Sequence, residues 1–301
     1  MNLELWQWII GLSAALFVGI SKTGIPGIGI VAVPLLALGF GGRLSAGVML
    51  PMLIMGDIFA VAWYRRHARW DKLVELLPWV YLGVAIGTVT LWKTGHSKSL
   101  KDPTDVIIGA IVLVMLILHL LRSRLSKQLQ PTSPAGVGGT GIAAGFATTV
   151  SNAAGPVMQM YMAAHKLSKE AFMGTIAWYF FIINFSKLPI YWILSAMIPQ
   201  KPIVTADSLL FNLEIAPAII LGAFLGKWLL PRIKQQSFES IVIILAAIGA
   251  LNLIFGATLV KRLHSNPPTK QTQSASVAAY RPASFEGAKP LPAAPRRTRS
   301  L

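Results

Sequence analysis

Two long apolar stretches of the chain are each interrupted near the middle by a similar polar string, residues 21–26 (SKTGIP) and residues 151–156 (SNAAGP). An unwound backbone is costly inside a membrane, because its N–H and C=O groups lose their helical partners and find no water. Such breaks are tolerated where they line a binding cavity, and a matched pair in the two halves of a chain is typical of a transporter site. The two breaks therefore predict both a membrane fold and the place of its site.

The composition around the breaks is that of a polytopic membrane protein, with 54% apolar and only 13% charged residues. Several runs approach or exceed the ~20 apolar residues that a spanning helix needs. We therefore predict an all-α fold, a polytopic transmembrane helical bundle. The expected spans lie near residues 44–64, 73–92, 106–121, 173–194, 213–230 and 240–260, and the two broken segments lie near 4–40 and 137–165.

The sequence offers little support for catalysis or for a bound metal. It contains no cysteine, so disulfides and thiolate metal sites are excluded. Its five histidines are scattered without metal-ligand spacing, and no nucleophile motif or phosphate-binding loop occurs. We therefore expect no cofactor, no metal and no enzymatic activity.

The same order of features occurs twice, which predicts an internal duplication. In each half a broken segment is followed by a polar residue inside a span, by a span with a Pro-x4-Gly-x3-Gly pattern, and by a plain apolar span. The glycines are expected to let helices pack closely. The matched positions are Asp57 with Asn184, Gly83 with Gly222, and Gly87 with Gly226. The predicted organisation is a first transmembrane repeat at 1–121, a cytoplasmic connecting loop at 122–136, a second transmembrane repeat at 137–260 and a disordered basic tail at 261–301.

The relative direction of the two repeats depends on how the broken segments cross. The stretch 4–40 would be about 55 Å long as one helix, against a hydrocarbon core of about 30 Å, which favours a hairpin that enters and leaves on the same side. Each half then has an odd number of spans, the halves are inverted, and most Lys and Arg residues of the loops fall inside. If each broken segment crosses once, the loop charges balance and only the tail favours that orientation.

Much of the net charge of +16 belongs to the tail at 261–301, which is rich in Pro, Ser, Ala and Gln and has no apolar period. This composition predicts disorder. Two interpretations of its basic residues stay open, contact with anionic lipid or a solvated tail without a specific partner. The expected partners of the protein are the lipid bilayer and a small anionic substrate, and no nucleic acid.

Three ionisable residues within apolar sequence are candidates for function, since such residues inside a membrane are rare and commonly functional. Lys22, in the first break, either binds a ligand or forms a structural ion pair with Asp57. Asp57 is a charge partner or a proton-coupling group, whereas its counterpart Asn184 cannot titrate. Lys187 lies toward the end of its span, where it either joins the site or extends to the membrane surface.

The breaks also supply neutral hydrogen-bond donors. New helices that begin after the breaks would aim backbone N–H groups and the positive ends of their dipoles at the same place. Such ends and one or two lysines predict an anion site, because a cation site would want acidic groups and only Asp57 is available. The predicted substrate-binding residues are Ser21, Lys22, Thr23, Gly24, Pro26, Thr149, Ser151, Asn152, Gly155, Pro156, Asn184 and Lys187.

Residues 19–27 (GISKTGIPG) resemble the first motif of the TauE/SafE sulfite exporter family, also called the 4-toluene sulfonate uptake permease (TSUP) family. Residues 149–156 (TVSNAAGP), 169–175 (KEAFMGT) and 184–189 (NFSKLP) resemble its second-half motif, and the likeness covers residues 5–260. The resemblance implies a bacterial inner-membrane protein, built from a duplicated four-segment unit, that moves sulfite, sulfonates or related organosulfur anions, often outward. The motif residues that it places in the site are Ser21, Lys22, Thr23, Gly24, Pro26, Asn152, Gly155, Pro156, Asn184 and Lys187.

These features predict a secondary carrier for a small anion, bound between the two unwound segments. The sequence leaves the direction of transport open, because an inside-negative potential favours export of an anion, whereas uptake needs coupling to protons or sodium. An anion channel is an alternative, recognised by currents beyond carrier rates. A membrane-embedded enzyme is a further alternative, disfavoured because no catalytic set of residues is visible.

Overall fold

The computed structural model describes residues 3–24, 27–97, 102–128 and 132–229, together with residues 247, 248, 250, 251 and 254. Pro26, the predicted tail and most of the span expected near 240–260 lie outside these residues. The described part is helical and contains no strand, which confirms the all-α prediction. The elements are α1 (Leu5–Thr23), the 3₁₀ helix η1 (Ile28–Val31), α2 (Ala32–Phe40), α3 (Gly42–Tyr64), the 3₁₀ helix η2 (Arg65–His67), α4 (Trp70–Gly95), α5 (Pro103–Gln128), α6 (Pro134–Ser151), α7 (Gly155–Ala164), α8 (Lys169–Met197) and α9 (Ala206–Leu229).

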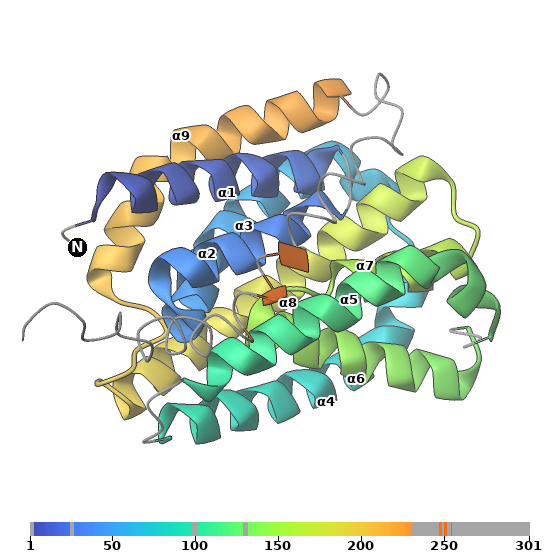
Figure 1. Cartoon of the computed structure of the whole chain (residues 1–301). Helices are drawn as coiled ribbons and strands as arrows, with labels where there is room; N and C mark the ends of the chain where they lie inside the picture. The colour runs from blue at the N-terminus through green and yellow to red at the C-terminus, as the bar shows by residue number, and fades with distance from the viewer. Residues whose placement is uncertain are drawn as a thin grey trace, which may run out of the picture. The chain divides into compact units, whose positions relative to one another are not determined.

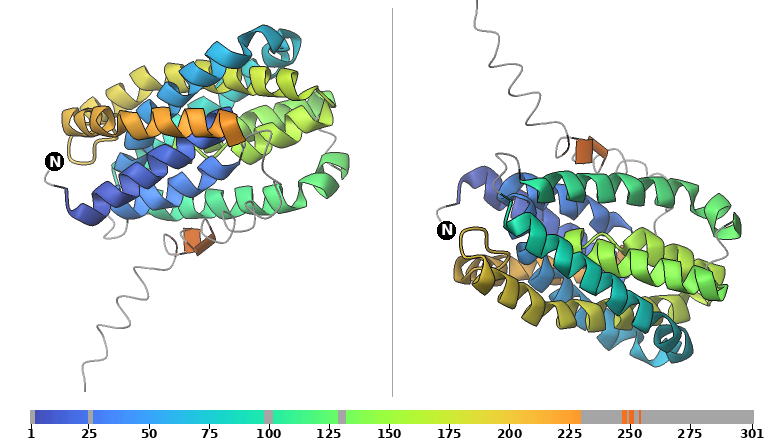
Figure 2. Two further views of the ribbon diagram at one scale, coloured as in Figure 1. Left: turned by 90° about the horizontal axis from the view of Figure 1, so that it is seen from above. Right: turned by 90° about the horizontal axis from the view of Figure 1, so that it is seen from below.

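Six helices of the described part are long and apolar enough to cross a bilayer, namely α1, α3 with η2, α4, α5, α8 and α9. The protein is therefore a multi-pass membrane protein. Large apolar side chains face outward, for example Leu213 and Trp192, which are 72% and 64% exposed, as a surface in contact with lipid tails allows. α5 runs along the outside of the bundle (Figure 2) and continues to Gln128, into the stretch expected to be a loop.

The first broken segment folds back on itself. α1 ends at Thr23, and the chain returns through η1 and α2. Gln7, near the start of α1, donates from Nε2 to the carbonyl of Gly39, near the end of α2 (2.8 Å). Gly29 of η1 lies against the Ser21 side chain at the other end of α1. The segment therefore has its two ends at the same end of the bundle, as expected of a hairpin.

The second broken segment also returns to the end from which it starts. α6 begins beside the first turns of α4, where Gly138 lies against Trp79. α7 runs back toward the same end, and the hydroxyl of Tyr161 donates to the carbonyl of Lys72 (3.4 Å). The turn between α6 and α7 consequently lies inside the bundle, beside α3.

Close packing joins helices of different predicted halves. α1 packs along α9, and α4 packs along α6, on opposite sides of the bundle (Figure 1). A Cβ atom at Gly83, Gly87, Gly222 or Gly226 would overlap the facing helix, so these contacts require glycine. The predicted close packing at the four glycines is confirmed. In each case the partner is a helix of the other half's broken segment, which the sequence pattern did not indicate.

The contacts also give the directions of the helices. α1 and α9 run parallel, because Gly11 lies against Phe211 and Gly24 against Gly226. α3 and α8 cross at Asp57 and Asn184, whose side chains share a hydrogen bond. If the sequence repeat is also a structural repeat, this contact places its two-fold axis near these two side chains. The inverted repeat stays a prediction, since the closing span of the second half lies mostly outside the described residues.

Candidate functional site

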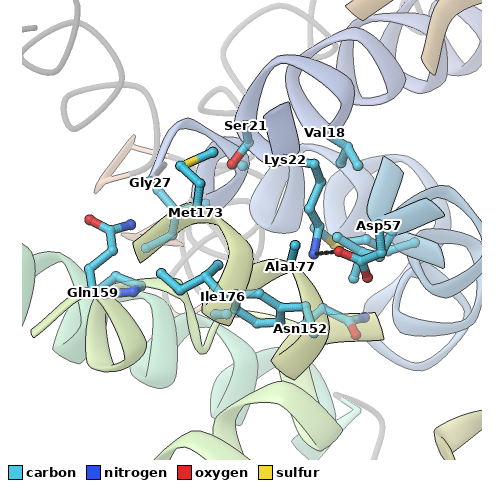
Figure 3. A pocket seen from close by; sticks show the side chains of 18 residues that line it. Val18, Ser21, Lys22, Gly27, Asp57, Asn152, Gln159, Met173, Ile176 and Ala177 are labelled. Carbon is cyan, nitrogen blue, oxygen red and sulfur yellow. Dashed lines mark ion pairs between the residues drawn. The ribbon is translucent and has the colours of Figure 1, made fainter. Parts of the chain in front are cut away.

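A cavity lies where the two breaks meet, between α1, η1, α3, α7 and α8 (Figure 3). Its volume is about 60 Å³. One water needs roughly 10–15 Å³, so the cavity has room for a small polyatomic ion. Most of the wall is apolar, and its polar side chains come from both breaks and the helices beside them. These polar residues are Ser21, Lys22, Asp57, Asn152 and Gln159.

The first break begins in the last turn of α1. Lys22 lies in that turn, where a cation complements the carbonyl end of the helix dipole. Gly27 then adopts a φ of 104°, in the left-handed region that favours glycine. The chain continues into the tighter 3₁₀ turn η1, and α2 begins only at Ala32. A helix therefore does begin directly after this break, as predicted, but its first turn is 3₁₀ and not α.

The side chain of Lys22 extends from α1 to Asp57 on α3. Nζ lies 2.7 Å from Oδ1 of Asp57, whose side chain is fully buried, and 4.1 Å from the centre of the Phe180 ring. Nδ2 of Asn184 donates to the other carboxylate oxygen (2.7 Å). Both Lys22 and Asp57 line the cavity (Figure 3). The ion pair is thus present, and it forms part of the cavity wall.

The second break begins at Asn152, which ends α6 in the left-handed conformation (φ 56°, ψ 21°). Asparagine is one of the few residues with a side chain that adopt it readily. Its Nδ2 donates to the carbonyl of Ala46 on α3 (3.0 Å), which ties the break to that helix. α7 starts at Gly155 with Pro156 in its first turn, and both residues line the cavity. A helix start has N–H groups without helical partners and a positive dipole end, so this wall favours negative charge.

Lys187 is fully buried behind the second break and does not reach the surface, so the alternative of an extended surface lysine is wrong. Its Nζ donates to the carbonyl of Thr148 (2.9 Å), to the Thr148 hydroxyl (3.0 Å) and to Oδ1 of Asn152 (2.7 Å). An ammonium has three N–H donors, so these neutral acceptors satisfy it fully. Lys187 therefore closes the carbonyl end of α6 and orients Asn152, and it lies outside the lining of the cavity.

The described binding residues that were predicted fall into three groups, namely those that line the cavity, those that touch the lining from behind and those that face other helices. Ser21, Lys22, Asn152, Gly155 and Pro156 line the cavity, as does the predicted charge partner Asp57. Asn184 and Lys187 touch lining residues from behind.

Other predicted residues of the breaks face neighbouring helices. The Thr23 hydroxyl donates to the carbonyl of Ala223 on α9 (2.6 Å), and Gly24 packs on Gly226. The hydroxyls of Thr149 and Ser151 donate back into their own helix, to carbonyls one turn earlier (2.8 and 2.9 Å). Thr23, Thr149 and Ser151 were predicted to bind the substrate, but their hydroxyls donate to backbone carbonyls instead.

Among the lining residues that were not predicted from the sequence, Phe180 and Gln159 contribute an aromatic ring and a polar amide. Phe180 lies one turn before Asn184 on α8 and covers the Lys22 ammonium, a cation–π contact worth about 0.5–2 kcal/mol. Gln159 lies one turn after Gly155 on α7, and its amide points into the cavity beside Gly27 (Figure 3). A polar residue at i+4 from a break motif, within an otherwise apolar helix, is a signal that could have identified Gln159.

The charges around the cavity favour a small anion. Lys22 and Asp57 are the charged residues of its lining, and Lys187 adds a third charge behind Asn152. Two lysines and one aspartate leave one positive charge in excess. Within the described ranges, no cluster of three or more His, Asp or Glu side chains could hold a metal ion.

Comparison with known proteins gives one match. A family model described as sulfite exporter TauE/SafE matches residues 11–253, which include both breaks and every cavity-lining residue. No curated protein and no solved structure matches the chain.

Proposed function

Because this chain belongs to the sulfite exporter TauE/SafE family, we propose that it is a secondary carrier for a small oxyanion such as sulfite or a sulfonate, bound at Lys22 between the two breaks. The family is one of membrane transporters, and the helices of this chain are long enough to span a bilayer. We place the protein in the bacterial inner membrane by the same family argument. The single observation that carries the proposal is the cavity at the meeting point of both breaks, lined by Lys22 and by the start of α7.

The difference between the two buried lysines supports Lys22 as the ligand-binding cation. Lys187 has three neutral acceptors and is sealed behind Asn152. Lys22 has one carboxylate oxygen and the Phe180 ring as neighbours, and it faces the cavity. Hydrogen bonds to charged groups are worth about 1.5–3 kcal/mol, so an oxyanion gains most at the lysine that still has donors to offer.

Flux measurements test the proposal. The full chain is purified, reconstituted in proteoliposomes, and assayed for flux of sulfite and of methanesulfonate. Lys22→Gln removes the cation, and we expect the apparent affinity for both anions to fall about 10- to 100-fold, as the loss of a charged hydrogen bond implies. Lys22→Arg keeps the charge in a different shape and is expected to retain partial flux.

Lys93→Gln is the matched control, because Lys93 also lies in the last turn of a helix but is exposed at the end of α4. It is expected to transport as the parent chain does. Undiminished flux and unchanged anion selectivity in Lys22→Gln, with the protein still folded by its elution profile, would contradict the site. Anion currents in planar bilayers that exceed the rates of carriers would show that the protein is a channel and not a carrier.

A further inference from the structure

The charges in and behind the cavity limit the net charge of the ligand that it can bind. This inference rests on the proposed transport function. We infer that the site accepts one net negative charge at a time: a monoanion binds as it is, and a dianion binds only together with a proton on Asp57. The substrate class is therefore a small monovalent oxyanion, or a divalent oxyanion taken with one proton.

The first step is the count of charges. Lys22 and Asp57 line the cavity and cancel each other. Lys187 is counted as an ammonium, because three oxygen acceptors surround its Nζ and match its three N–H donors, and it adds one positive charge behind Asn152. A monoanion brings this buried group of charges to zero. A dianion leaves one uncompensated negative charge, which is expensive in a buried site. Protonation of the carboxylate removes that excess.

The second step is that Asp57 has a place for a proton. Its Oδ2 accepts from Asn184, whereas Oδ1 accepts no hydrogen bond among the described residues, although Lys22 Nζ lies 2.7 Å away. Lys22 is therefore the partner of this oxygen. When an anion draws the Lys22 ammonium away, Oδ1 is left buried beside the cavity without a donor. A proton on that oxygen restores a neutral group.

The third step is that few other charges act on this carboxylate. Lys22 of α1 and Lys187 of α8 are the cations nearest to it. α2 and α6, which also contact α3, carry no ionisable side chain. On the other elements packed against α3, the exposed ionisable side chains are Asp207, Glu214 and Lys227 of α9 and Arg65, Arg66 and His67 of η2. Asp105 of α5 accepts from the amide of Gly42 at the start of α3, and His119 of α5 lies against Gly27. Asp57 is consequently the group whose protonation follows the charge of the ligand.

The transport step then balances without any other co-reactant. A proton from the aqueous phase binds Oδ1 of Asp57 as the dianion binds Lys22, and both leave on the opposite side. One net negative charge moves per cycle for either class of ligand. Monoanion transport moves no proton, whereas dianion transport moves one.

The experiment uses the full chain in proteoliposomes that contain a pH indicator, with the membrane potential set by potassium and valinomycin. Methanesulfonate is the monoanionic probe, and sulfite at alkaline pH, together with sulfate, supplies the dianions. We expect a charge-to-ion ratio of one for every transported probe, with proton movement only for the dianions. A ratio of two for a dianion, without proton movement, overturns the inference but leaves the proposed carrier intact. Absence of flux for every probe contradicts the proposed function itself.

Asp57→Asn provides the second readout. It removes the proton site, and its amide oxygen can still accept from Asn184. We expect proton movement with dianions to disappear. We also expect the ratio of dianion flux to methanesulfonate flux to rise about tenfold or more, because the negative charge of Asp57 is removed. The repulsion of one unit charge a few ångströms away is worth at least that factor, even at an effective dielectric of ~20. Asp71→Asn is the matched control, since Asp71 is also paired with a cation, Arg69 at 3.0 Å, but is half exposed. An unchanged flux ratio in Asp57→Asn contradicts the inference.

Discussion

Replacement of Gly145 by alanine tests the close approach of α4 and α6 on which the second break depends. An alanine Cβ at this position would lie 2.9 Å from both the Val80 carbonyl carbon and the Val84 amide nitrogen, and would overlap the Val80 carbonyl oxygen. Ordinary contacts of this kind are 3.4–4 Å. The overlap with the Val80 carbonyl oxygen requires the two helices to separate by more than about 1 Å, and a gap of roughly 0.5–1 Å already forfeits a quarter to a half of each dispersion contact.

The expected cost follows from a matched comparison within the same helix. Gly139 also lies in α6, but a Cβ there meets no atom within 4 Å. Both substitutions change helix propensity equally, by about 1 kcal/mol, so this effect cancels in the difference between them. What remains is overpacking, which costs about 1–3 kcal/mol. We expect Gly145→Ala to be less stable than Gly139→Ala by this amount.

Equilibrium unfolding of the purified variants in detergent micelles by titration with sodium dodecyl sulfate measures the difference. Equal unfolding midpoints and slopes for the two variants would refute the described contact between α4 and α6. A lower stability of Gly145→Ala should also lower the apparent anion affinity, because α6 carries Thr148 and Asn152, which hold Lys187. Gly139→Ala should leave the anion affinity unchanged.

Two further predictions concern stability and the placement of side chains. Lys22→Met and Asp57→Leu each remove one partner of the Lys22–Asp57 pair, and each is expected to lower the free energy of unfolding by about 3–5 kcal/mol. The double variant should recover most of that loss, which a thermodynamic cycle measured by the same unfolding titration will show. Thr23→Val should cost about 0.5–1.5 kcal/mol, because it removes the hydrogen bond to Ala223, and should not change the anion affinity measured in proteoliposomes. If Thr23→Val lowers the anion affinity without lowering the free energy of unfolding, Thr23 is a binding residue after all.

The apolar pattern was sufficient to predict five of the six described helices that are long enough to span, because in lipid each helix satisfies its own backbone and its length is set by the bilayer. The exception is α1, which was expected to be part of a broken segment. The helix that begins at Gly42 and the one that begins at Trp70 were both expected within a few residues. The pattern could not show which helices pair. α1 packs on α9 and α6 on α4 because the glycines of one half fit the backbone of the other, and a sequence shows the glycines but not the surface they meet.

Residue chemistry predicted part of the site and misplaced the rest for a physical reason. Lys22 and Asp57 were identified because a charge in apolar sequence is costly without a use. Thr149 and Ser151 were included because they are polar, yet a hydroxyl in a helix can donate to the carbonyl one turn earlier, and these two do. Local sequence does not reveal which choice a hydroxyl makes, since the answer depends on whether the helix face meets a cavity or another helix.

The unequal chemistry of the two halves, with a lysine and an aspartate in the first and Lys187 on α8 in the second, is what gives the site its excess charge. The predicted duplication aligns Lys22 with Asn152 and Asp57 with Asn184. If both halves had a lysine and an aspartate at these positions, and Lys187 were absent, two lysines and two aspartates would meet at a space of about 60 Å³ and would cancel as two internal ion pairs. In the present chain the second half keeps only amides at those positions, and its own cation, Lys187, is held by neutral oxygens. One positive charge is therefore left without an internal partner, and an anion is the ligand that supplies one.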